Sequence, residues 1–230
     1  ANQDPAQSAQ LIASIDDTKL RKQAITSVAS SWGTTDPNAA IDWANSLPAD
    51  ESYKALSSII PRLAANSPQL AIRHYETLAA STGNDNSKIP SLSNVAGSIA
   101  SHWSTFDPEA ASAWVSTLPD ENAQRRATSS IVSNWVTQDI DKAGQWVDSL
   151  PDGKARDSGV QSLTNVLTNK NPAAAFDWAE TISDDFQRKS TLRSVIRQWK
   201  QYDIEKARNA VEQANLTDEE YEYLTKELKP

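Results

Sequence analysis

Apolar residues recur along the chain in short blocks with helical spacing, and each block follows a similar polar signal. The clearest blocks are DPNAAIDWANSLPAD, DPEAASAWVSTLPD, DIDKAGQWVDSLPD and NPAAAFDWAETISDD. After the Pro or Ile that opens each block, Ala stands at +3, Trp at +6 and Leu or Ile at +10. These offsets fall on one face of an α-helix, so each block predicts an amphipathic helix.

The residues around each block indicate where this helix starts and stops. Asp, Ser or Asn stands before the Pro or Ile, and such side chains accept hydrogen bonds from the free N–H groups of a first helical turn. Pro is well tolerated directly afterwards. A repeated carboxylate also suggests metal binding or acid–base chemistry, but uncharged Ser67 and Asn171 take the same place, which favours capping. The Leu-Pro pair then ends the helix, because a residue before Pro is biased away from helical geometry.

The opening pairs repeat with a period of about 32 residues. Their second members are spaced by 32, 31, 40, 32, 32 and 32 residues, and a second helix completes each unit, often with Trp near its end. Stacked neighbours of this kind bury a shared core, in which we expect the tryptophans. We predict an all-α fold, an α-α superhelix (solenoid) of about seven helical hairpins forming one domain over 1–230. The predicted repeats are approximately 4–35, 36–66, 67–106, 107–138, 139–170, 171–202 and 203–230.

This pattern resembles the tetratricopeptide-type helical hairpin over essentially the whole chain. In that family a Pro stands six residues before a Trp, as Pro108 and Trp114 do here. The period is 32 and not 34, and the family's Gly and Tyr on the first helix are missing. The chain looks closer to a Trp-rich DPxxAxxWxxxLP repeat of uncharacterised bacterial proteins, which are often exported. The resemblance implies that the first helix of each hairpin lines a concave groove.

Composition narrows the classes of function. The net charge is −8, so nucleic acid is not the expected partner, because its phosphates would be repelled. No apolar run approaches the roughly 20 residues of a membrane span. There is no Cys, there are two His, and the common catalytic and nucleotide-binding motifs are absent. We therefore expect no enzyme activity, catalytic residue, metal site or cofactor.

Polar positions on the first helix supply the candidate binding surface. The row of residues at +5 and +8 is polar and net acidic, which suits a basic or polar segment of a protein or peptide partner. The predicted function is a non-catalytic interaction scaffold. The alternative is a structural spacer in a larger exported protein, without a dedicated ligand. The partner-binding candidates are Asp42, Arg73, Glu76, Asp148, Asp177 and Glu180.

Three further features leave alternatives open. A recurring Arg near the start of the second helix (Arg21, Arg125 or Arg126, Arg156, Arg188) is either a ladder for an anion or a packing group that pairs with acids or stacks on Trp. The insert Ser81 to Pro90 reads as an extended loop, either for binding or as tolerated length variation. The start at Ala1 fits a mature exported chain and also a trimmed one, with export the expectation. The oligomeric state is left open.

Overall fold

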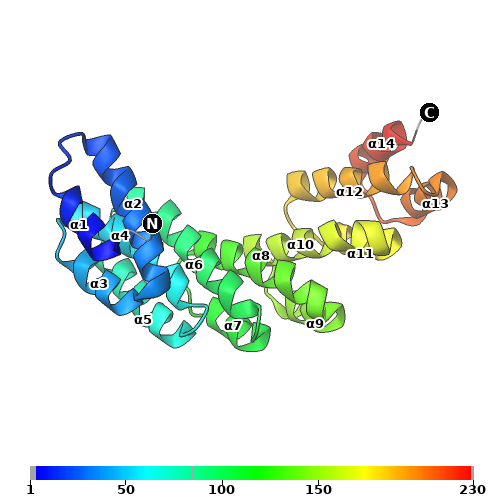
Figure 1. Cartoon of the computed structure of the whole chain (residues 1–230). Coiled ribbons are helices and arrows are strands. Elements are labelled where there is room, and N and C mark those ends of the chain that lie inside the picture. Colours follow the sequence, from blue (N-terminus) through cyan, green and yellow to red (C-terminus); the bar gives the residue numbers. More distant parts are fainter. Residues whose placement is uncertain (1–3, 84, 229–230) are drawn as a thin grey trace. The chain divides into compact units, whose positions relative to one another are not determined.

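The computed structural model describes residues 4–83 and 85–228, and this part of the chain is all-α (Figure 1). It contains fourteen α-helices and one 3-10 turn, with no strand among the described residues. The predicted all-α class is confirmed, and the fourteen helices match the seven predicted helical hairpins in number. The chain divides into two compact units, an N-terminal unit up to Trp114 and a C-terminal unit from Val115.

The helices alternate between the first and second members of the predicted hairpins. The early helices are α1 (Pro5–Ile12), α2 (Thr18–Thr35), α3 (Pro37–Asn45), α4 (Ala49–Leu63), α5 (Pro68–Ser81), the 3-10 turn η1 (Asn86–Lys88), α6 (Ile89–Ser104) and α7 (Pro108–Val115). The later ones are α8 (Glu121–Gln138), α9 (Ile140–Ser149), α10 (Lys154–Lys170), α11 (Pro172–Glu180), α12 (Asp185–Trp199), α13 (Ile204–Gln213) and α14 (Asp218–Glu227).

Capping at the starts of the first helices follows the prediction with one exception. The side chain before α5, Ser67, makes no capping hydrogen bond. At the other six starts, the side-chain oxygen accepts from a backbone N–H two or three residues later, over 3.0–3.2 Å. These residues are Asp4, Asp36, Asp107, Asp139, Asn171 and Asp203. The recurrent carboxylates therefore define helix starts.

The second helices pack directly on one another within each unit. In the N-terminal unit α4 lies against both α2 and α6, and in the C-terminal unit α10 contacts α8 and α12, while α12 also contacts α14. First helices fit between these second helices: α3 packs on α2 and α4, and α11 packs on α10 and α12. Within each unit, successive even-numbered helices therefore contact one another, and odd-numbered helices lie against them.

The tryptophans are part of the packed interior, as expected. None of the eight is exposed, and Trp103, Trp114, Trp135 and Trp199 are buried. A Trp that closes one second helix meets the Trp of the following first helix. Ring centroids are 5.8 Å apart for Trp32–Trp43, 6.3 Å for Trp103–Trp114 and 6.0 Å for Trp135–Trp146. Aromatic pairs at this separation add to the stability that their burial supplies.

The extra length in the third repeat is only partly a loop. Helix α5 runs for 14 residues up to Ser81, which exceeds the 8–10 residues of the other first helices. Gly83 follows with a φ of 50°, a conformation that favours Gly. The turn η1 then leads into α6, which already contains Pro90 at its start. The predicted extended loop is therefore corrected: an extra helical turn of α5, Gly83 and the turn η1 occupy the described part of the insert, and Asn84 lies outside the described residues.

Candidate functional site

A groove of about 830 Å³ lies between α9 and α11, with α10 as its floor. We call it the α9–α11 groove. Its size matches that of sites that take a peptide side chain or a small ligand. It is lined by Ile140, Asp141, Gly144, Gln145, Asp148, Leu163, Leu167, Lys170, Asn171, Ala174, Asp177, Trp178 and Thr181.

Packing between Gly144 and Trp178 sets the form of this groove. A Cβ added at Gly144 would lie 3.3 Å from Cζ2 of Trp178, so the indole lies against the bare backbone of α9. Trp178 is half-buried, and Leu163 and Leu167 line the groove from α10. The indole therefore packs on α9 and also lines the groove.

The charges around the groove are mostly negative. Asp141, Asp148 and Asp177 are exposed and line it, whereas Lys170 is the one cation among its lining residues. Asp148 Oδ1 is 3.6 Å from Nη2 of the buried Arg156, but the Asp148 side chain remains 74% exposed. The carboxylate therefore retains most of its access to solvent and to a bound cation.

Two adjacent buried residues of α10, Arg156 and Asp157, bind the end of α11 and the loop after it, on the α11 side of the groove. Arg156 donates a hydrogen bond of 2.7 Å to the carbonyl of Thr181, which ends α11. Asp157, only 2% exposed, accepts from the backbone N–H of Ser183 at 2.8 Å, from its hydroxyl at 2.9 Å, and from the N–H of Asp184 at 3.0 Å. Charge-assisted hydrogen bonds of this kind are stronger than neutral ones. The loop after α11 is thereby fixed to α10.

Two of the recurring Arg residues, Arg21 and Arg188, pair with acids of a neighbouring helix. This favours the packing role over an anion-binding ladder. Arg21 Nε lies 2.8 Å from Glu51 Oε1, and Arg188 Nε lies 2.8 Å from Glu220 Oε1. Each pair joins neighbouring second helices. Both acids belong to the next repeat, and Arg188 also pairs with Asp185 at the start of its own helix, with 2.9 Å between Nη2 and Oδ1.

The structure brings two of the six predicted partner-binding residues together. Asp148, at +8 of α9, and Asp177, at +5 of α11, both line the α9–α11 groove. In the N-terminal unit Asp42 on α3 and Arg73 and Glu76 on α5 are exposed. Whether these three bind a partner stays a prediction.

Glu180 lies outside the α9–α11 groove and is half-buried. Burial is the largest influence and raises its pKa; a hydrogen bond from the backbone of Asn215 opposes the rise, and the negative charge of Asp177 adds to it. Asn215 follows α13, so Glu180 is placed on the side of α11 toward the next repeat. Positions +5 and +8 of one helix therefore serve different neighbours.

The N-terminal unit has a cavity between α3 and α5 that lies against the N-terminal half of α4, whereas the α9–α11 groove lies over the C-terminal half of α10. The cavity has a volume of about 470 Å³ and involves α3, α4, α5 and η1, with His74 at the +6 position where Trp stands elsewhere. His74 is half-buried, and its pKa is lowered from 6.5 by burial and then by the charge of Arg73. The lining residues are Asn45, Ala49, Ser52, Tyr53, Leu56, His74, Thr77, Leu78, Ser81 and Lys88.

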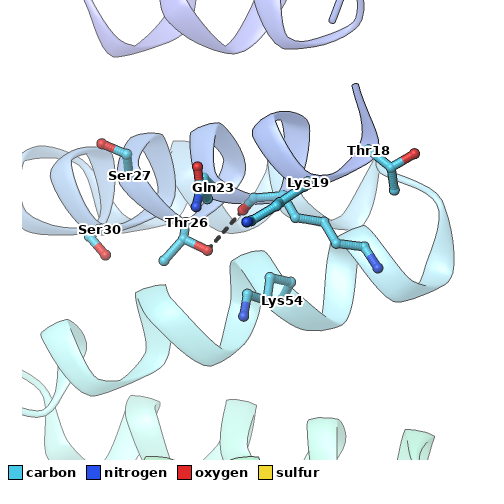
Figure 2. Close-up of a pocket in the computed structure, with 8 residues that line it drawn as sticks. Thr18, Lys19, Gln23, Thr26, Ser27, Ser30 and Lys54 are labelled. Carbon is cyan, nitrogen blue, oxygen red and sulfur yellow. Dashed lines mark hydrogen bonds between the residues drawn. The ribbon is translucent and has the colours of Figure 1, made fainter. Parts of the chain in front are cut away.

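A further groove of about 650 Å³ runs along α2 and carries only positive charge (Figure 2). Lys54 reaches it from α4, and the remaining lining residues belong to α2. Thr26 donates its hydroxyl to the carbonyl of Lys22 at 3.0 Å. The lining residues are Thr18, Lys19, Lys22, Gln23, Thr26, Ser27, Ser30 and Lys54. In a chain of net charge −8, this is a local reversal of sign.

Sequence reasoning missed several residues of these grooves. Trp178 was expected only in the core, and Asp141 and Lys170 were not considered. Gly144 carried a usable signal, because the other first helices have larger residues at +4, such as Ile41 and Phe176. A missing side chain there indicates close contact with a neighbour.

Within residues 4–83 and 85–228, no three His, Asp or Glu side chains form a cluster suited to a metal ion. In the same part of the chain, no helix has the length and hydropathy needed to cross a membrane. Comparisons with known protein families, with curated proteins and with solved structures found no match.

Proposed function

We propose that this chain is a non-catalytic scaffold that binds a basic or polar segment of a protein or peptide partner. The observation that carries the proposal is the α9–α11 groove, where Asp148 and Asp177 come together beside the half-buried Trp178. A Lys or Arg side chain can reach these carboxylates and also lie against the indole face, which attracts cations. The expected partner is thus a segment that carries a Lys or Arg side chain.

The proposal includes a stacked solenoid of seven tetratricopeptide-like hairpins. It is supported by the regular period, and by the packing of first helices between consecutive second helices in each unit. Repeat architectures use such surfaces for binding because side chains that do not pack the core can vary from repeat to repeat. The rigid wall supplied by Arg156 and Asp157 favours a preformed site, which lowers the entropic cost of binding.

The first test is a selection of short displayed peptides against the native chain. We expect enrichment of peptides that contain Lys or Arg. Their affinities are then compared by fluorescence anisotropy for the native chain and for a variant with Asp148→Lys and Asp177→Lys. Exposed ion pairs contribute modestly, so reversing two charges should weaken binding about tenfold.

The matched control carries Asp16→Lys and Asp152→Lys, two exposed substitutions in loops that change the net charge equally. This control should retain affinity to within about twofold. Failure to enrich any peptide would favour the spacer function. Enriched peptides that bind the groove variant as tightly as the native chain would place the binding surface elsewhere.

A further inference from the structure

Neighbouring second helices make contacts that follow one positional rule. We count along each second helix from its N-cap, Asp17 in α2, Asp184 in α12 and Thr217 in α14. Arg188, at +4 of α12, pairs with Glu220, at +3 of α14. Arg21, at +4 of α2, pairs in the same way with Glu51, at +3 of α4. Position +4 of one helix therefore faces position +3 of the next.

Two more pairs locate position +2 of the later helix. Lys189, at +5 of α12, pairs with Glu219, at +2 of α14. Glu121, at +1 of α8, lies 2.8 Å from Lys154 of α10. The N-cap of α10 is Gly153, so α10 is instead counted from Asp152, which stands as far before Leu167 as Asp120 does before Trp135; Lys154 then takes position +2. A residue at +2 is thus faced by positions +1 and +5 of the preceding helix.

Helix α2 presents the positions that would meet a preceding helix, and they are open. Lys19 at +2, Leu20 at +3 and Gln23 at +6 are all exposed, and Leu20 is 54% exposed. By contrast, Glu220 at +3 of α14 is only 5% exposed, because α12 covers it. We call these three residues of α2 the head face. Two of its residues, Lys19 and Gln23, also line the groove of Figure 2.

Helix α14 presents the positions that would meet a following helix. Asp218 at +1, Tyr221 at +4 and Glu222 at +5 are exposed, and Tyr221 is 45% exposed. Glu222 pairs with Lys226 on its own helix, in an exposed ion pair of 2.8 Å. We call Asp218, Tyr221 and Glu222 the tail face. The ring of Tyr221 at +4 of α14 stands where α2, α10 and α12 have Arg.

The head and tail faces match each other position by position. Under the rule above, Tyr221 at +4 would cover Leu20 at +3, so that two exposed apolar groups are buried together. Lys19 at +2 would lie between Asp218 at +1 and Glu222 at +5, as Lys154 lies beside Glu121. The pair of Glu222 at +5 with Lys19 at +2 would use the same two positions as Lys189 and Glu219, with the acid and the base exchanged.

We propose that the tail face of one copy of this chain docks on the head face of a second copy, which continues the stack of second helices from molecule to molecule. The favoured occupant is a second copy because both halves of the contact, apolar against apolar and acidic against basic, are on this chain. Such a head-to-tail contact uses two different surfaces, so it does not close after two copies. Association should therefore proceed beyond dimers as concentration rises.

The test is sedimentation velocity of the native chain from about 10 µM to about 1 mM, the range expected of a small interface. We expect the average mass to rise with concentration past twice the chain mass of 25.1 kDa. A rise from about 0.05 M to about 0.5 M salt should reduce association, because the Lys19 contacts are screened. A native chain that stays monomeric throughout would overturn the proposal.

Two blocked variants separate a head-to-tail contact from other modes. Leu20→Glu blocks the head face and Tyr221→Glu blocks the tail face. Both place Glu at an exposed site in the first part of a helix, where its charge suits the helix dipole, so folding should be preserved. Each variant alone should be monomeric, while an equimolar mixture should form a dimer and stop. Dimers of either variant alone, or no dimer in the mixture, would contradict the proposal.

A charge exchange tests the register. Lys19→Glu should weaken association about tenfold, and mixing it with a Glu222→Lys chain should restore a large part of the loss. Lys206→Glu, which makes the same charge change on α13, outside the head face and the α9–α11 groove, is the control and should leave association unchanged to within about twofold. Equal weakening by Lys19→Glu and Lys206→Glu would show that net charge alone, without this contact, controls association.

Discussion

Helix α4 in the N-terminal unit and helix α10 in the C-terminal unit use the same position to hold the following repeat, with opposite hydrogen-bonding roles. Tyr53, at +5 of α4, donates its hydroxyl to the carbonyl of Lys88 at 3.0 Å, just before α6. Asp157, at +5 of α10, instead accepts from the N–H groups of Ser183 and Asp184 just before α12. The repeat therefore specifies where a neighbour is attached, and the individual residue decides how.

The two units also differ at the +6 position of their first helices. His74 in α5 and Trp178 in α11 are both half-buried. The imidazole borders a cavity with Tyr53 and Lys88, whereas the indole borders a groove with Asp148 and Asp177. The +6 residue thus borders a recess in each unit, while its neighbours make the N-terminal recess basic and the C-terminal groove acidic.

The largest effect is expected from Asp157→Ala, which removes the acceptor of three hydrogen bonds at a buried site. The N–H and hydroxyl of Ser183 and the N–H of Asp184 would lose their acceptor, so the free energy of unfolding should fall by about 3 kcal/mol. Tyr53→Phe, the matched change in the N-terminal unit, removes one neutral hydrogen bond and should cost about 1 kcal/mol. Urea unfolding followed by circular dichroism measures both. Equal losses would show that the two attachments do not differ in strength.

The next effect concerns the +6 position. Trp178→Leu should lower the free energy of unfolding by about 2 kcal/mol, because a large ring that contacts both α9 and the groove is truncated. His74→Leu should change it by about 0.5 kcal/mol or less, since the half-buried imidazole is replaced by a side chain of similar size. Thermal unfolding of both variants provides the comparison. A larger loss for His74→Leu would mean that the imidazole has a structural role comparable to that of the Trp.

A third comparison concerns the contributions of the Arg188–Glu220 and Arg21–Glu51 pairs to the free energy of unfolding. The Arg188–Glu220 contribution should depend on pH. Burial by itself raises the pKa of Glu220, but hydrogen bonds from the Thr217 backbone and from Arg188 outweigh it, and the net pKa lies below 4.5. The folded state therefore binds this proton less readily than the unfolded chain does. The resulting stabilisation is complete above pH about 4.5 and is lost as the pH falls through the lowered pKa.

Accordingly, Glu220→Gln should reduce the free energy of unfolding by about 2 kcal/mol at neutral pH, where it removes a charged partner of Arg188 and part of a capping box. The deficit should shrink at a pH below the lowered pKa, where native Glu220 is also neutral. Glu51→Gln should cost less, because Glu51 pairs with Arg21 without closing a capping box. Urea titrations at neutral and acidic pH measure these differences. A deficit for Glu220→Gln that is independent of pH would rule out this electrostatic role.

The smallest effect is expected at Gly144. Ala should add about 0.5 kcal/mol, because the gain in helix propensity exceeds the cost of moving the half-buried Trp178 by a few tenths of an ångström. Gly159→Ala is the contrasting change in the same unit. Its added Cβ would lie 3.0 Å from Val147 Cγ2 and 3.1 Å from Thr128 Cγ2 in a buried site, so a loss of about 1 kcal/mol is expected. Thermal unfolding separates the two signs, and a loss at Gly144 would show that Trp178 cannot move.

The amino-acid sequence by itself determined the local structure. A capping side chain before Pro and a Trp six residues later act within one helix, where a period of 3.6 makes burial readable from spacing. The fourteen helices of the described residues, six of the seven first-helix caps and the burial of Trp103, Trp114, Trp135 and Trp199 follow from such short-range rules.

Only the tertiary structure decided which offsets of neighbouring helices meet. The sequence suggested one row of +5 and +8 residues, whereas Asp148 at +8 of one helix faces the same groove as Asp177 at +5 of the next, and Glu180 lies elsewhere. Arg188 likewise reaches Glu220, 32 residues further on. These contacts depend on how one hairpin lies against the next. Small differences such as Gly144 in place of a larger residue set that packing, and no periodicity within a single helix records it.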